Sequence, residues 1–80
     1  MNEKLKRVAM NENGFIFDPQ TGISYTANST GIEILKKLKE TNNIDKIRDR
    51  LAQEFEVSKE EAERDIIDFL ELLKIKGFVE

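Results

Sequence analysis

The 80-residue sequence predicts an α+β domain in which a three-stranded antiparallel β-meander is followed by three helices. The sheet is predicted by short runs of alternating apolar residues, separated by turns that contain glycine or proline. The helices are predicted by apolar residues that recur every three or four positions behind polar capping residues. Because the chain has the length of one small domain and contains no linker-like segment, we expect a single domain over residues 1–80.

The predicted meander begins with a strand at Lys4–Met10, and turn composition at Asn11–Gly14 separates this strand from the next one. The second and third strands, Phe15–Phe17 and Ile23–Ala27, flank the segment Asp18–Gly22. In that segment proline presets φ, aspartate can accept a bond from the backbone two residues on, and glycine tolerates a positive φ. The two phenylalanines of the second strand fall at period 2, and we assign them to the core.

A capping residue precedes each of the three predicted helices. The first helix begins near Thr30, where Thr30 and Glu33 have capping-box spacing and Asn28 and Ser29 are rival caps. The second covers about Ile44–Phe55, and the third covers about Lys59–Lys76. A compact helix pair beside a small antiparallel sheet makes the predicted fold winged-helix-like.

The composition offers few groups for catalysis. The chain has no cysteine and no histidine, so it lacks thiolate ligands, the commonest general base and the commonest neutral metal ligand. We therefore expect no enzyme activity, no catalytic residue, no metal site and no cofactor. No apolar run approaches the roughly 20 residues that span a bilayer, and no signal peptide is recognisable. A cytoplasmic protein that does not bind membranes is the expectation.

Motifs in a fixed order run through most of the chain. The first half contains Phe15-x-Phe-Asp-Pro-x-Thr-Gly22 and then Tyr25-x-x-Asn-x-Thr-Gly31. The second half contains Glu60-Glu-Ala-x-x-Asp-Ile-x-x-Phe69 and ends near Gly77-Phe78. This series resembles the signature of PqqD-like proteins, which are recognition elements for ribosomally made precursor peptides (RiPPs).

The resemblance implies that the chain is a peptide chaperone. Such a protein binds the leader segment of a precursor peptide and presents it to a modifying enzyme, often a radical SAM enzyme. In this family the peptide adds as a strand to the edge of the third strand and faces the third helix. The peptide-binding residues that the resemblance implies here are those of the third strand, Ile23, Ser24, Tyr25, Thr26 and Ala27, and one flank of the third helix. Residue spacing on that helix places Asp65, Asp68, Leu72 and Lys76 on the candidate flank, with Phe69 beside them.

One departure from the family pattern concerns the pathway. The branch that makes pyrroloquinoline quinone usually ends its last helix with Gly-Trp, whereas this chain has Gly77-Phe78 and no tryptophan. We therefore expect a PqqD-like protein of another peptide-modification or cofactor-biosynthesis pathway. Because the chain begins at Met1 and ends three residues after Gly77, we also expect a free-standing domain.

Several candidate residues also have a purely structural interpretation. Leu72 lies off the main apolar stripe of the last helix, and it is either a peripheral core contact or a groove residue. Asn28 is either a helix cap or a peptide contact, and the ring of Tyr25 can belong to the core. Asp65 and Asp68 can be solvated charges.

Two other classes of function remain open. A winged-helix protein can bind nucleic acid through its last helix, but here that helix begins Lys59-Glu-Glu-Ala-Glu-Arg-Asp65, whose carboxylates would face phosphates. A net charge of −3 and a pI near 5.0 also argue against a nucleic-acid partner. The basic cluster Lys36, Lys37 and Lys39 is interpreted as a solvated face. The other class is a docking subunit that binds only an enzyme. An open edge strand allows either a monomer or a dimer paired through that edge.

Overall fold

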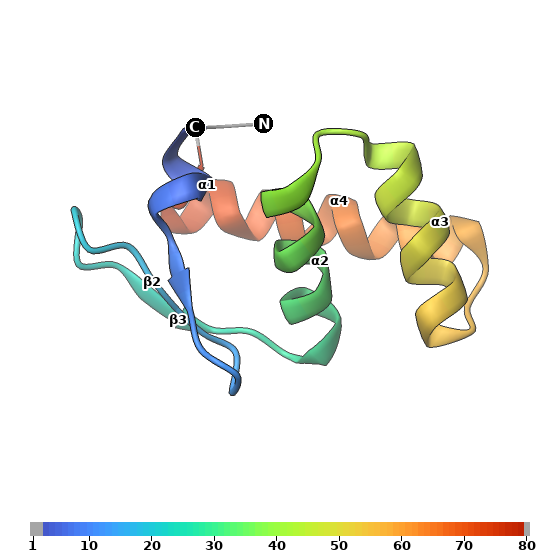
Figure 1. Cartoon of the computed structure of the whole chain (residues 1–80), viewed down its shortest axis with the longest axis horizontal. Coiled ribbons are helices and arrows are strands. Elements are labelled where there is room, and N and C mark those ends of the chain that lie inside the picture. Colours follow the sequence, from blue (N-terminus) through green and yellow to red (C-terminus); the bar gives the residue numbers. More distant parts are fainter. Residues whose placement is uncertain (1–2, 80) are drawn as a thin grey trace.

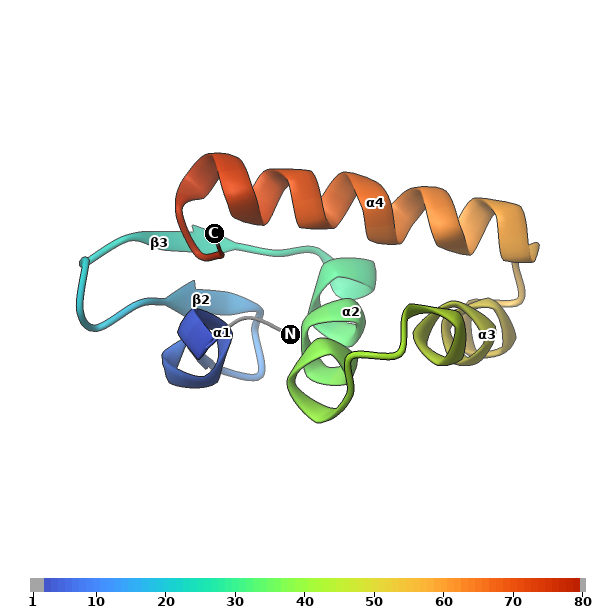
Figure 2. The same ribbon diagram turned by 90° about the horizontal axis from the view of Figure 1, so that it is seen from above.

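The computed structural model describes residues 3–79, with the elements in the order α1, β1, β2, β3, α2, α3 and α4. The sheet and α1 lie at one end of the molecule, and α3 lies at the other end (Figure 1). Helix α4 runs along most of the length of the molecule, from beside α3 to beside the sheet (Figure 2). Three antiparallel strands followed by helices confirm the predicted fold class.

The sheet is a meander of three short strands in the order β1-β2-β3. Strand β1 covers Ala9–Met10, β2 covers Phe15–Phe17 and β3 covers Ser24–Thr26. Both pairings are antiparallel, and Ile16 of β2 lies opposite Tyr25 of β3. Because β2 is the central strand, one side of β3 is an open sheet edge.

The N-terminal segment differs from the prediction of a strand over residues 4–10. Glu3–Arg7 forms the short helix α1, and only Ala9–Met10 pairs with β2. Leu5 and Val8 are both buried in the core. A helical turn places two residues three positions apart on one face, whereas a strand would direct them to opposite faces. The burial of both side chains therefore favours the helix.

A partly buried ion pair joins α1 to the hairpin. Asp18 is fully buried, and its Oδ1 lies 3.2 Å from Nε of Arg7. The same carboxylate accepts the backbone N–H of Gln20 at 2.9 Å, which is the turn contact expected of this aspartate. Burial alone would raise the pKa of Asp18, but the bonds from Gln20 and Arg7 and the charge of Arg7 outweigh it and hold the pKa below 3.8.

The phenylalanines of β2 lie on the outer face of the sheet, so their assignment to the core is wrong. Phe15 is 42% exposed and Phe17 is half-buried, whereas Ile16 between them is fully buried. The two rings stack with their centroids 6.4 Å apart. Since all three residues of the strand are apolar, the alternation defines two faces without indicating which of them packs on the helices.

The three main helices begin and end close to the predicted residues. They are α2 (Ser29–Glu40), α3 (Ile44–Phe55) and α4 (Lys59–Lys76). Helix α2 is capped by Asn28, whose Oδ1 accepts the N–H of Gly31 at 2.9 Å, so the cap is one of the two rivals and not Thr30. The caps of α3 and α4 are Asn43 and Ser58. Each side-chain oxygen satisfies a backbone donor that the first helical turn leaves free.

One lysine of the basic cluster on α2 is buried, contrary to the predicted solvated face. Lys37 is 3% exposed, and its Nζ lies 2.7 Å from Glu54 of α3 and 3.2 Å from Glu33. One carboxylate from the preceding turn of α2 and one from α3 provide the counter-charge that a buried ammonium needs. Lys39 also turns inward at its tip, where its Nζ donates to the backbone carbonyl of Val8.

The end of α4 folds back onto the core as predicted. Gly77 ends the helix in a left-handed conformation, and the N–H of Phe78 donates to the carbonyl of Leu73 at 2.8 Å. Phe78 and Val79 are both buried. The N–H of Gly77 also donates to the carbonyl of Lys74 at 3.1 Å. These two hydrogen bonds hold the last turn of α4 beside the sheet.

Candidate functional site

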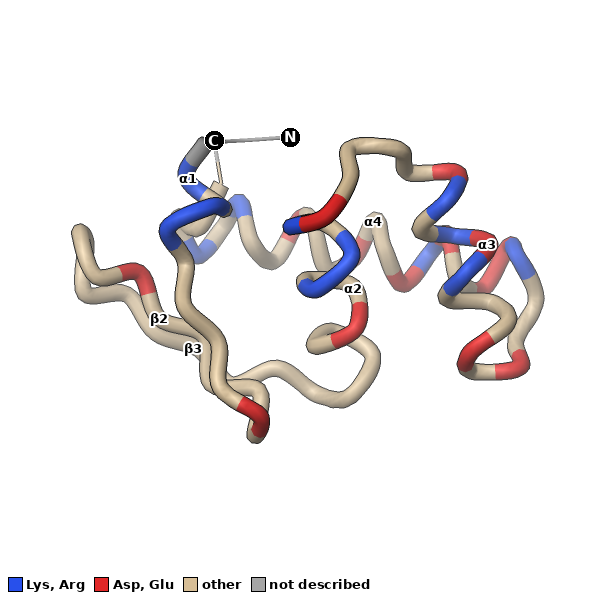
Figure 3. Tube along the Cα trace, viewed as in Figure 1, with Lys and Arg blue, Asp and Glu red and all other residues tan. Residues whose placement is uncertain are grey.

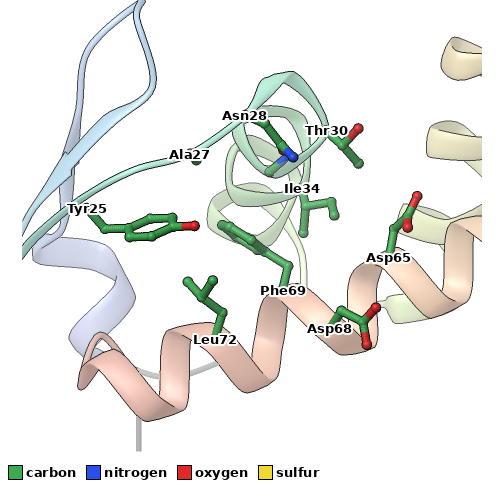
Figure 4. Close-up of a pocket in the computed structure, with 10 residues that line it drawn as sticks. Tyr25, Ala27, Asn28, Thr30, Ile34, Asp65, Asp68, Phe69 and Leu72 are labelled. Atoms are coloured by element: carbon green, nitrogen blue, oxygen red, sulfur yellow. The ribbon is translucent and has the colours of Figure 1, made fainter.

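A groove of about 290 Å³ lies between β3, the start of α2 and the middle of α4 (Figure 4). Strand β3 and α4 run alongside each other in this region (Figure 2). The lining residues come from β3 and the segment after it, from the first turns of α2, and from one flank of α4. They are Tyr25, Ala27 and Asn28, then Thr30, Gly31 and Ile34, and finally Asp65, Asp68, Phe69 and Leu72.

The open edge of β3 borders this groove with unpaired backbone groups. The N–H of Asp18 donates to the carbonyl of Ile23 at 2.9 Å, which places Ile23 at a bonded position of the β2–β3 pair. Bonded and outward positions alternate along an antiparallel strand. Ser24 and Thr26 therefore direct their N–H and C=O groups toward the open edge, where another extended chain can bind them.

The middle of the groove is apolar. Tyr25, Phe69 and Leu72 point toward one another across it (Figure 4). The ring of Phe69 reaches this position because Gly31 has no side chain: a Cβ there would lie 2.9 Å from Cε1 of the ring. Leu72 is half-buried at the groove wall, so both interpretations of this residue, as a core contact and as a groove residue, apply to it.

The two ends of the groove carry opposite charges. Asp65 and Asp68 line the end beside the start of α2. At the other end, Nζ of Lys76 lies 5.5 Å from the centre of the Tyr25 ring, a distance typical of a cation–π contact. Asn28 lines the groove while its side chain caps α2, so its capping role is established by the bond to Gly31.

The structure brings most of the predicted site residues together. Tyr25, Ala27, Asp65, Asp68, Phe69 and Leu72 line the groove, Ser24 and Thr26 form its open edge, and Ile23 and Lys76 lie beyond its Tyr25 end. The contribution of α2 was missed: Thr30, Gly31 and Ile34 also line the groove. A usable signal was the short distance in sequence between the third strand and the cap, since the first turn of the next helix must then lie at the strand's end.

Among residues 3–79, no group of three or more acidic side chains is arranged to hold a metal ion. Within the same residues, no helix combines the length and the apolar character needed to cross a membrane.

Comparisons with known proteins point to one family. The family model described as coenzyme PQQ synthesis protein D (PqqD) matches residues 13–79. A solved structure described as lasso peptide synthetase B1 complexed with the leader peptide is 30% identical in sequence, with a TM-score of 0.74. That similarity covers 88% of this chain and 84% of the other chain. No match was found among the curated proteins.

Proposed function

The chain belongs to the family of coenzyme PQQ synthesis protein D, and from this membership we propose that it binds the leader segment of a ribosomally made precursor peptide. The observation that carries the proposal is the groove beside the open edge of β3, whose middle is lined by Tyr25, Phe69 and Leu72. The similar lasso peptide synthetase B1 structure, described as complexed with the leader peptide, supports it.

In the proposed complex the leader adds as an extra strand along β3. The backbone groups of Ser24 and Thr26 bind the peptide main chain, which contributes affinity that depends little on sequence. Apolar leader side chains contact Phe69 and Leu72, and these contacts provide selectivity. Ordering a free peptide costs about 2–5 kcal/mol of the gross interaction energy. We therefore expect a Kd in the micromolar range, which corresponds to a binding free energy of about −8 kcal/mol.

The proposed role of the complex is presentation of the peptide to a modifying enzyme. The family resemblance favours a radical SAM enzyme, and the departure at Gly77-Phe78 favours a pathway other than pyrroloquinoline quinone synthesis. The chain itself contributes binding and no catalysis, which agrees with its lack of histidine and cysteine. Modification of the precursor by an enzyme encoded beside this gene should slow when the chain is omitted. Turnover by the purified chain alone would contradict the proposal.

The test of binding is a titration of the ¹⁵N-labelled chain with the leader of a short peptide encoded beside its gene. We expect chemical-shift changes in residues 24–27 and along 65–76, since these segments form the two walls of the groove. Changes confined to residues 36–49 would place the peptide elsewhere and refute the proposed site.

Two variant pairs make the titration specific. Leu72→Asp should weaken peptide binding at least tenfold, because it puts a charge against the apolar part of the groove. Its control is Ile75→Asp, which makes the same type of change on α4 at a position that is 83% exposed and outside the groove. Thr26→Pro removes an outward N–H and should also weaken binding, whereas Thr26→Ala keeps that donor. Circular dichroism of all four variants checks that the fold is intact.

A further inference from the structure

The charged side chains at the two ends of the groove have no ionic partner in the described part of the chain. No lysine or arginine among residues 3–79 lies within salt-bridge distance of Asp65 or Asp68, whereas Glu33, Asp49 and Glu54 are all paired. Lys76 contacts the ring of Tyr25 and no carboxylate of the described residues. A ligand that lies in the groove therefore meets negative charge at one end and positive charge at the other.

The separation of these charges fits an extended peptide. Lys76 follows Asp68 by eight residues and Asp65 by eleven, which corresponds to roughly 12–17 Å along a helix axis. A strand rises about 3.4 Å per residue, so about four strand residues cover this distance. Residues four positions apart project from the same face of a strand. Two side chains of one bound strand can thus reach both ends of the groove.

The direction of the added strand determines the order of the charges. Strand β3 begins near the Lys76 end of the groove and leads toward the start of α2, where the aspartates lie, while α4 runs alongside it in the opposite direction (Figure 2). Both existing strand pairs are antiparallel, and antiparallel pairing is slightly more stable per residue. A strand antiparallel to β3 enters at the aspartates and leaves at the lysine.

We propose, on the basis of the proposed function, that this groove selects leader segments with a basic residue, an apolar residue two positions later and an acidic residue two positions after that. The basic side chain faces Asp65 and Asp68, the apolar one contacts Phe69 and Leu72, and the acidic one faces Lys76. Figure 3 shows the underlying pattern along α4, in which acidic residues give way to basic ones toward its C-terminal end.

Three synthetic peptides of equal length test this pattern, and they differ only at the two charged positions. One has the order basic-x-apolar-x-acidic, the second has the two charges exchanged, and the third has glutamine at both charged positions. Each is labelled with fluorescein and titrated with the full chain in a fluorescence anisotropy assay. We expect the first to bind about tenfold more tightly than the second, with the third between them, because each surface charge pair contributes modestly. At about 1 M salt the difference should shrink, since the Debye length falls to about 3 Å.

A charge-reversal variant provides the matched control. Asp65→Lys/Asp68→Lys should remove the preference for the first peptide over the second, whereas Glu71→Lys, an exposed position on the same helix outside the groove, should preserve it. A tighter complex with the charge-exchanged peptide would overturn the proposed strand direction and with it the proposal.

The outcomes also separate this inference from the proposed function. Equal binding of all three peptides with shifts at residues 24–26 would overturn charge selection and leave leader binding intact. Binding of the encoded leader without binding of any designed peptide would do the same. Failure of both the encoded leader and the designed peptides to perturb residues 24–26 would overturn the proposed function itself.

Discussion

Two glycines with similar left-handed backbones test how closely the first turn approaches the end of β3. Gly14 has φ 87° and Gly22 has φ 79°. A Cβ on Gly14 would lie 2.5 Å from the backbone oxygen of Ala27 and 2.8 Å from Cδ1 of Ile32. A Cβ on Gly22 would meet no atom within 4 Å. We therefore predict that Gly14→Ala destabilises the protein much more than Gly22→Ala.

Both substitutions strain the backbone, and only Gly14→Ala also creates a steric overlap. An alanine in the left-handed region costs about 1–2 kcal/mol, and the stiffer unfolded chain offsets about 0.4–1 kcal/mol of this. Gly22→Ala should thus lower the free energy of unfolding by about 1 kcal/mol. Gly14→Ala adds overpacking of about 1–3 kcal/mol, for a loss of about 2–4 kcal/mol. Relief is difficult because Ala27 is bonded to Gly14 through its own N–H at 2.8 Å.

Urea denaturation followed by circular dichroism measures both losses. We expect the midpoint to fall further for Gly14→Ala, with the slope of the transition unchanged in both variants. Equal losses in the two variants, within about 0.5 kcal/mol, would refute the close approach between the turn and Ala27. Gly14→Ala should also displace the backbone next to the groove, so its peptide affinity should fall while that of Gly22→Ala is retained.

Three further predictions concern Asp18, Lys37 and the affinity of the chain for DNA. The folded-state pKa of Asp18 is lowered, so the ionised carboxylate stabilises the fold above pH 3.8. This stabilisation is lost as the pH falls through the folded-state pKa. Asp18→Asn should therefore flatten the decline of Tm on the acid side. Lys37→Met should change the free energy of unfolding by less than about 1 kcal/mol, because partly exposed Glu33 and Glu54 remain solvated. Binding to duplex DNA at physiological salt, measured by anisotropy, should be no tighter than about 10⁻⁴ M.

The parts of the fold that the sequence predicted well are those encoded by local signals. Helices α3 and α4 occur at the predicted residues because Asn43 and Ser58 mark their starts and each has a continuous apolar stripe. The hairpin follows from the turn segment at residues 18–22. These signals depend on neighbours in sequence, so they do not require knowledge of the tertiary structure.

The incorrect predictions concern features that depend on tertiary contacts. Helix α1 has only five residues, and its burial of Leu5 depends on the surrounding core. The outward orientation of Phe15 depends on which face of the sheet the helices cover, and the burial of Lys37 depends on Glu54 of another helix. In the same way, the family resemblance indicated the β3 and α4 walls of the candidate site, whereas the part formed by α2 required the three-dimensional arrangement.

The shortness of β3 has a kinetic consequence for the proposed peptide ligand. The strand has three residues, and only Ser24 and Thr26 direct backbone groups to its open edge. So few main-chain bonds limit how long a peptide stays bound. For a micromolar Kd and an ordinary association rate constant of about 10⁶ M⁻¹s⁻¹, dissociation occurs at about 1 s⁻¹. A residence time of about a second would let one copy of the chain deliver many precursor molecules in succession, so that it can act in substoichiometric amounts.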